Sequence, residues 1–224
     1  MTAIATTAGT SSTPAGRATA LLGCGKAAGP IYLTVVAVQA LVRDGFDPRK
    51  HAASMLTLGE GGWVQSLNFV LTGLLVVLGA AGLRRAGSVG RWAPRLLAVF
   101  GVGMAKAGVF VPDPALGFPV GTPDGLPVTM SWHGTLHFAV GGVGFLAFVV
   151  CCFLIARCFA ADGARGRAAY SAVTGVVFLA AFGGIASGSA GAGVTVAFWV
   201  AVVLAFTWIT LTVGTVATRS VKLG

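Results

Sequence analysis

The stretch "GWVQSLNFVLTGLLVVLGAAGL", residues Gly62–Leu83, decides the fold of this chain. It contains no charged side chain and only a few polar ones. An α-helix rises 1.5 Å per residue, so about 20 apolar residues cross the roughly 30 Å hydrocarbon core of a bilayer. This stretch therefore predicts a helix that spans a membrane.

Five further apolar segments approach or exceed the same length. Lipid offers the backbone no hydrogen-bond partners, so segments that cross it must satisfy their own N–H and C=O groups as helices. We predict an all-α fold, an integral membrane bundle of six transmembrane helices within residues 19–219, preceded by a disordered tail at 1–18, which is small and polar. The predicted helices cover about 27–42, 62–83, 94–111, 131–156, 168–187 and 194–217.

The composition excludes a water-soluble domain. Hydrophobic residues make up 56% of the chain and charged residues 9%, whereas a soluble domain carries about 25% charged residues. The net charge of +9 does not indicate nucleic acid, because the cations form short clusters between apolar runs. We expect the lipid bilayer as the partner of this chain and no nucleic acid.

The distribution of Lys and Arg predicts the orientation. Three cations, Arg43, Arg49 and Lys50, fall in the first connection, and Lys106 lies inside the third segment. The other eleven fall in alternate regions: Arg17, Lys26, Arg84, Arg85, Arg91, Arg95, Arg157, Arg165, Arg167, Arg219 and Lys222. Because cytoplasmic loops carry the excess of Lys and Arg, we predict a multi-pass protein of the cell membrane with both termini cytoplasmic.

The connection "PDPALGFPVGTPDGLPVTMSWHGTLH", residues Pro112–His137, gathers polar chemistry on the opposite, outer side. It holds two aspartates and two histidines and no cation. The absence of cations follows from the predicted orientation, whereas the acids and imidazoles need a second explanation. His51 and Glu60 belong to the other connection on this side, so we predict an outward-facing cluster of Asp and His side chains.

His133 and His137 lie four residues apart at the start of the fourth helix, so they share one face. Two imidazoles at this spacing can bind one metal ion. Zinc proteases have Glu directly after the first histidine, where this chain has Gly134, so that class is excluded. Asp113 can complete a His/His/Asp set with an open position for water, which predicts zinc or another divalent metal and makes these three residues the catalytic candidates.

Four further polar residues are predicted to line an outer-facing pocket for a small molecule or a lipid: Lys106, Gln65, Asn68 and Glu60. Lys106 lies two turns before Asp113, and its flexible stem allows an ion pair with that carboxylate. Gln65 and Asn68 have an alternative role in hydrogen bonds between helices, worth about 0.6 kcal/mol each on average.

A structural explanation of the Asp/His cluster is the one that we favour. In this alternative Asp113 accepts hydrogen bonds from backbone amides at the end of the connection. His133 then bonds the connection itself, and His137 bonds a neighbouring helix. Buried or perturbed polar groups indicate a functional site only statistically.

Three motifs, "GWVQSLNFVLTGLL", "GVFVPDP" and "HGTLHF", occur in this order on these helices. Together they resemble the domain of unknown function 998 family, a group of uncharacterised polytopic membrane proteins. The resemblance covers about residues 30–215, and its most specific parts are Gly108–Pro114 and His133–His137. It implies a membrane protein of several helices and no established activity.

Three functions are compatible with these observations. The first is a non-enzymatic binding or accessory role, which we favour. The second is a metal-dependent integral membrane hydrolase that acts at the outer leaflet. The third is a small-solute transporter, which ranks last because neither an inverted repeat nor a matched pair of broken helices is evident.

Overall fold

The computed structural model describes residues 14–189 and 191–222, and the regular elements in this part are all helices. Six long helices and one short 3₁₀ helix, η1, follow one another without a strand. Each long helix packs against the next, and α6 returns to α1, so the six helices form a closed ring. Their bounds are α1 Pro14–Val42, η1 Ala53–Thr57, α2 Gly62–Ala86, α3 Trp92–Val109, α4 Trp132–Ala161, α5 Arg165–Ala186 and α6 Ala192–Lys222.

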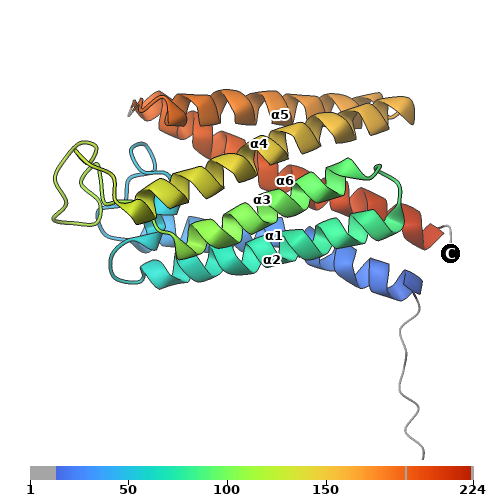
Figure 1. Ribbon diagram of the computed structural model, residues 1–224, viewed down its shortest axis with the longest axis horizontal. Coiled ribbons are helices and arrows are strands. Elements are labelled where there is room, and N and C mark those ends of the chain that lie inside the picture. The colour runs from blue at the N-terminus through green and yellow to red at the C-terminus, as the bar shows by residue number, and fades with distance from the viewer. Residues whose placement is uncertain (1–13, 190, 223–224) are drawn as a thin grey trace, which may run out of the picture.

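Successive helices run antiparallel along one long axis (Figure 1). The connections 43–61 and 110–131 lie together at one end of the bundle, which we call the loop end. The start of α1, the α2–α3 and α4–α5 connections and the end of α6 lie at the other end, which we call the basic end because eleven of the fifteen cations belong to these regions.

Five of the helices are long and apolar enough to cross a membrane: α1, α2, α4, α5 and α6. This confirms an all-helical protein of the membrane type. The remaining long helix, α3, has 18 residues and carries Arg95 and Lys106, and it is less apolar than the other five. It nevertheless runs the length of the bundle between α2 and α4 (Figure 1).

Several helices extend beyond the predicted apolar runs. The first begins at Pro14 and not near residue 27, so residues 14–18 are helical and do not belong to a disordered tail; residues 1–13 lie outside the described part. Helix α4 continues to Ala161 and α6 to Lys222, past the predicted ends at 156 and 217. The physical reason is that backbone hydrogen bonding continues along a helix after the apolar run has ended. In α1, the buried side chain of Leu22 also packs the early turns against the bundle.

Small residues bring α1 and α2 into backbone contact. A Cβ atom added to Gly25 would lie 2.7 Å from the Cα atom of Gly79, so no larger residue fits at this crossing. Close approach of this kind is a general means of packing helices in lipid, where the hydrophobic effect contributes little to helix association.

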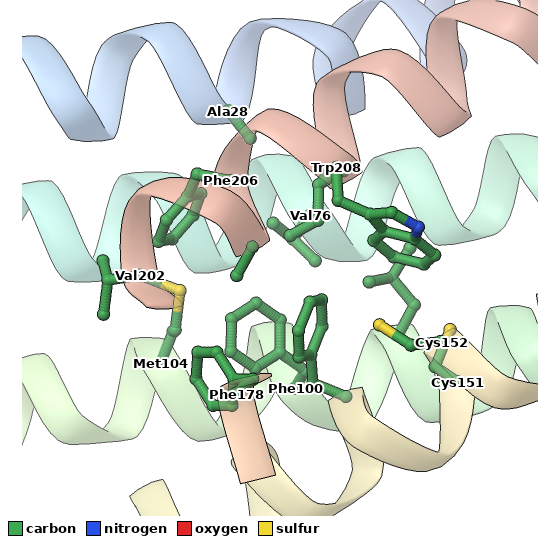
Figure 2. Packing of buried hydrophobic residues seen from close by; sticks show 14 of the residues in the cluster. Ala28, Val76, Phe100, Met104, Cys151, Cys152, Phe178, Val202, Phe206 and Trp208 are labelled. Carbon is green, nitrogen blue, oxygen red and sulfur yellow. The ribbon is translucent and has the colours of Figure 1, made fainter. Parts of the chain in front are cut away.

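Aromatic side chains fill the centre of the ring. Phe100, Phe178, Phe206 and Trp208 come from three different helices and belong to one buried cluster (Figure 2). Trp208 also donates a hydrogen bond from Nε1 to Ser171 Oγ at 2.8 Å, which joins α6 to α5. These contacts fix α3, α5 and α6 around the middle of the bundle.

Candidate functional site

The loop end is held together by a cation at the end of α1. The Arg43 guanidinium donates hydrogen bonds to the carbonyl oxygens of Leu56, at 3.1 Å, and Leu58. Its Cζ atom also lies 5.5 Å from the centre of the Phe118 ring, within the range of a cation–π contact. Arg43 therefore joins α1 to η1 and to the 110–131 connection.

His51 is buried at the same end and forms hydrogen bonds with three segments of the chain. The Asp47 backbone N–H donates to His51 Nδ1 at 2.9 Å, so the ring proton lies on Nε2, which donates to Leu116 O at 3.0 Å. Trp199 Nε1 donates to the His51 carbonyl oxygen at 3.0 Å. One residue thus joins both connections to α6, and both ring nitrogens are used.

Asp113 lies at the N-terminus of α4. Its Oδ2 accepts a hydrogen bond from the Ser131 N–H at 2.9 Å, and Ser131 Oγ accepts one from the Gly134 N–H at 3.0 Å. Both bonds satisfy amides near the start of a helix, where the helix dipole also favours a carboxylate. Asp113 thus accepts a hydrogen bond from a backbone amide at the end of the connection, as the structural explanation of the Asp/His cluster predicts.

His137 makes the reciprocal contact at the C-terminus of α3. Its Nδ1 lies 2.7 Å from Phe110 O and 3.1 Å from Ala107 O, and because both are acceptors, Nδ1 carries the ring proton. These carbonyls belong to the last turn of α3, where a helix leaves its acceptors without partners. We call Asp113, Ser131 and His137 the α3–α4 clamp.

The α3–α4 clamp explains why glycine occupies position 134, between His133 and His137. A Cβ atom added to Gly134 would overlap the Asp113 carboxylate, so the carboxylate reaches the start of α4 only because position 134 has no side chain. The Asp-Pro and His-Gly-x-x-His motifs are therefore two halves of one contact between helices.

His133 does not join this contact. Its ring centre lies 3.5 Å from that of Trp132, and its buried Nδ1 finds no hydrogen-bond partner in the described part of the chain.

Metal binding by the Asp/His cluster would use the other ring nitrogen of His137. Because His137 Nδ1 donates to backbone carbonyls, Nε2 is the atom left to bind a metal, an arrangement common in metal sites. Within residues 14–189 and 191–222, however, no three His, Cys, Asp or Glu side chains gather so that they could hold one ion, and metal binding stays a prediction.

Gln65 and Asn68 lie buried between α1 and α2, and neither of them lines a cavity described below. Gln39 Nε2 donates to Gln65 Oε1 at 2.7 Å, and Asn68 Nδ2 donates to the same oxygen at 3.2 Å. Asn68 Oδ1 in turn accepts from Thr72 Oγ1 at 3.3 Å. The structure thus gives these amides the role of hydrogen bonding between helices.

Lys106 and Glu60 are both exposed. Lys106 forms no ion pair with Asp113, since among the described residues the ion pair present is that of Arg49 with Asp47. Arg49 donates hydrogen bonds to the Asp47 carboxylate, with Nη2 and Oδ2 2.9 Å apart, and this lowers the pKa of Asp47 to about 2. The sequence prediction had placed Lys106 and Glu60 in the pocket with the histidines, and the cavity is formed without them.

A cavity of about 560 Å³ lies beneath the loop end, enclosed mainly by α3, α4, α5 and α6. Asp113 and His137 line it, with Lys50 and Thr195 as further polar residues. Its deeper wall is aromatic and includes Phe100, Phe145, Phe178, Phe182, Phe198 and Phe206. Ligand sites in proteins have this size and this combination of apolar walls with a few polar groups.

The sequence analysis missed this aromatic wall. The 14 Phe residues of the chain are the available signal, because several recur at helical spacing within the fourth to sixth apolar segments. Periodicity alone does not distinguish a filled core from a hollow one, since both need apolar residues on the inner face of each helix.

The fold and the site define a class, a multi-pass helical membrane protein with an apolar cavity under its polar connections. The chain belongs to the family described as Protein of unknown function (DUF998), whose profile matches residues 26–215. No curated protein and no solved structure matches it. The predicted resemblance is confirmed, and the family assigns no activity.

Proposed function

We propose that this protein binds a small apolar or amphipathic molecule, such as a single lipid, in the loop-end cavity, and that it carries out no reaction on it. The observation behind the proposal is the cavity itself, with a volume of about 560 Å³ and aromatic walls. Two of the polar residues that line it, Asp113 and His137, are engaged with the protein, since each bonds backbone groups. This engagement favours binding over catalysis by the same residues.

We further propose six membrane crossings, with the loop end outside the cell and both termini in the cytoplasm. Support for the sixth crossing comes from α3, which lies lengthwise between two apolar helices (Figure 1). Support for the orientation comes from the cations of the basic end, because Lys and Arg accumulate on the cytoplasmic side. In this arrangement the cavity receives its ligand from the outer leaflet or the outer solution.

The cavity offers a specific test in Gly141 of α4. This residue lines the cavity, and a Cβ atom added to it would meet no heavy atom within 4 Å. It also shares the inner face of α4 with His137 and Phe148, so a larger side chain at 141 would enter the open space. The Cβ of Gly141→Phe therefore has room, and the ring is directed into the proposed site.

Gly183 of α5 provides the matched control. It also has open space around its missing Cβ, but it does not line the cavity. Wild type, Gly141→Phe and Gly183→Phe should be purified in a neutral detergent, and the bound organic compounds extracted and measured by mass spectrometry. The proposal predicts one compound enriched on wild type and Gly183→Phe, and reduced at least tenfold on Gly141→Phe. Equal amounts of every compound on all three proteins would contradict it.

A further inference from the structure

A second cavity, of about 520 Å³, lies near the basic end between α1, α5 and α6. Its two charged lining residues are both cations, Lys26 from α1 and Arg167 from α5. The rest of the lining comes from α6, whose contributing residues lie one helical turn apart: Thr210, Leu211, Gly214, Thr215 and Thr218. Two positive charges from different helices thus face one hollow.

The protein supplies no counter-ion for these charges in the part that the structure describes. The lining contains no Asp or Glu, and the ion pair of the described residues, Arg49 with Asp47, belongs to the loop end. Two cations that converge without an acid create a positive potential that attracts an anion.

The geometry around α6 leaves room for the lysine side chain. The stem of Lys26 lies over Gly214, whose added Cβ would be 3.8 Å from Lys26 Cδ, so the absence of a side chain at 214 accommodates the lysine. Thr210 Oγ1 is buried against Gly29 of α1, and Thr215 and Thr218 donate to carbonyls of their own helix. Lys26 and Arg167 therefore remain as the donors to a ligand.

The surface beside the cavity is apolar. Leu211 lines the hollow and is 55% exposed, and Val203 and Val200 continue the exposed strip along the same side of α6. A ligand with a phosphate in the cavity and a hydrocarbon chain along this strip would match both surfaces. Basic hollows between transmembrane helices near the cytoplasmic surface bind the headgroups of anionic lipids in this way.

We propose that this basic cavity binds the phosphate of an anionic phospholipid, with Lys26 and Arg167 on the phosphate oxygens. An acyl chain of the lipid lies along Leu211, Val203 and Val200. This site shares no lining residue with the loop-end cavity, so its test does not depend on whether a ligand binds there.

The test measures the melting temperature of the full-length protein in a neutral detergent against the concentration of added lipid. Dioleoyl phosphatidylglycerol, dioleoyl phosphatidylcholine and inorganic phosphate are compared on wild type and on Lys26→Gln/Arg167→Gln. Arg84→Gln/Arg85→Gln is the matched control, because it removes the same charge from the same end of the bundle but not from the cavity.

Phosphatidylglycerol should raise the melting temperature of wild type and of the Arg84/Arg85 control at the same lipid concentration. The apparent affinity of Lys26→Gln/Arg167→Gln should fall roughly 25-fold, from about fivefold for each basic residue near an anionic lipid surface.

Three outcomes would overturn this proposal. An equal loss of affinity in the two double variants would mean diffuse attraction to the basic end. Equal stabilisation by phosphatidylcholine would exclude recognition of an anionic lipid. Equal stabilisation by inorganic phosphate would identify a free anion as the ligand and remove the role of the strip on α6.

Discussion

The α3–α4 clamp predicts a specific loss of stability in His137→Ala. The single proton on His137 Nδ1 serves two carbonyl oxygens at 2.7 and 3.1 Å, and the ring is buried. Side-chain hydrogen bonds between membrane helices contribute about 0.6 kcal/mol on average and up to about 1.7 kcal/mol. The substitution leaves the carbonyls without this donor, and the penalty of about 1–3 kcal/mol for such unsatisfied groups includes the lost hydrogen bond, so we expect a total loss of about 1–3 kcal/mol.

The assay is reversible unfolding in mixed micelles with a rising fraction of sodium dodecyl sulfate, which gives the free energy of unfolding. Leu136→Ala is the control, because Leu136 is exposed on the same turn of α4 and exchanges contacts with lipid. His137→Asn should retain part of the stability, since its amide N–H lies near the position of Nδ1, whereas His137→Gln should resemble Ala. Stability of His137→Ala within about 0.5 kcal/mol of wild type, or Gln as good as the native residue, would refute the clamp.

Further predictions concern the same end of the molecule. Gly134→Ala should lower the free energy of unfolding by about 0.5–2 kcal/mol, because it displaces Asp113 from the start of α4, whereas Gly166→Ala in the same assay should be neutral or stabilising. Removal of divalent metal with a chelator should leave the melting temperature unchanged; about one metal ion per purified chain, lost with stability on chelation, would support the hydrolase alternative. The folded pKa of Asp47 is lowered to about 2, so the contribution of its ion pair with Arg49 is present at neutral pH and is lost as the pH falls through about 2. Arg49→Gln should therefore shift the Asp47 carboxyl titration, followed by carbon NMR, toward higher pH; an unchanged titration would exclude the pair as the cause.

The sequence predicted the elements of this fold because lipid leaves the backbone few alternatives. A long uncharged stretch such as Gly62–Leu83 must be helical in hydrocarbon, and its structure as α2 agrees. The ends were less accurate, since residues such as Pro14 and Lys222 lie in helices that extend past the apolar run. Hydrophobicity locates the crossing of a membrane, not the end of a hydrogen-bonded helix.

The sequence predicted that Asp113 and His137 lie at the same end of the bundle. It did not predict the role of either residue. Their spacing was compatible with both metal binding and a structural contact. The choice depends on where the backbone carbonyls of Ala107 and Phe110 lie, and this is a property of the tertiary structure. His51 was placed only by topology, because its partners are backbone groups that no motif records.

The loop-end cavity was beyond sequence reasoning for a related reason. Its walls are phenylalanines that also build the core, as the packing of Phe100, Phe178 and Phe206 illustrates (Figure 2). Whether such residues meet or leave a space depends on the angles and distances between helices. Local patterns do not contain that information.

The central claim is a membrane-embedded bundle whose loop end, and with it the cavity mouth, faces the outside of the cell. Val128 in the 110–131 connection is fully exposed, and Ser88 is exposed in the α2–α3 connection at the basic end. Intact cells that express Val128→Cys or Ser88→Cys should be treated with a membrane-impermeant thiol reagent, with wild type as the background for its four free cysteines. We predict labelling of Val128→Cys in intact cells and of Ser88→Cys only after permeabilisation. The reverse pattern, or labelling of both in intact cells, would contradict the account.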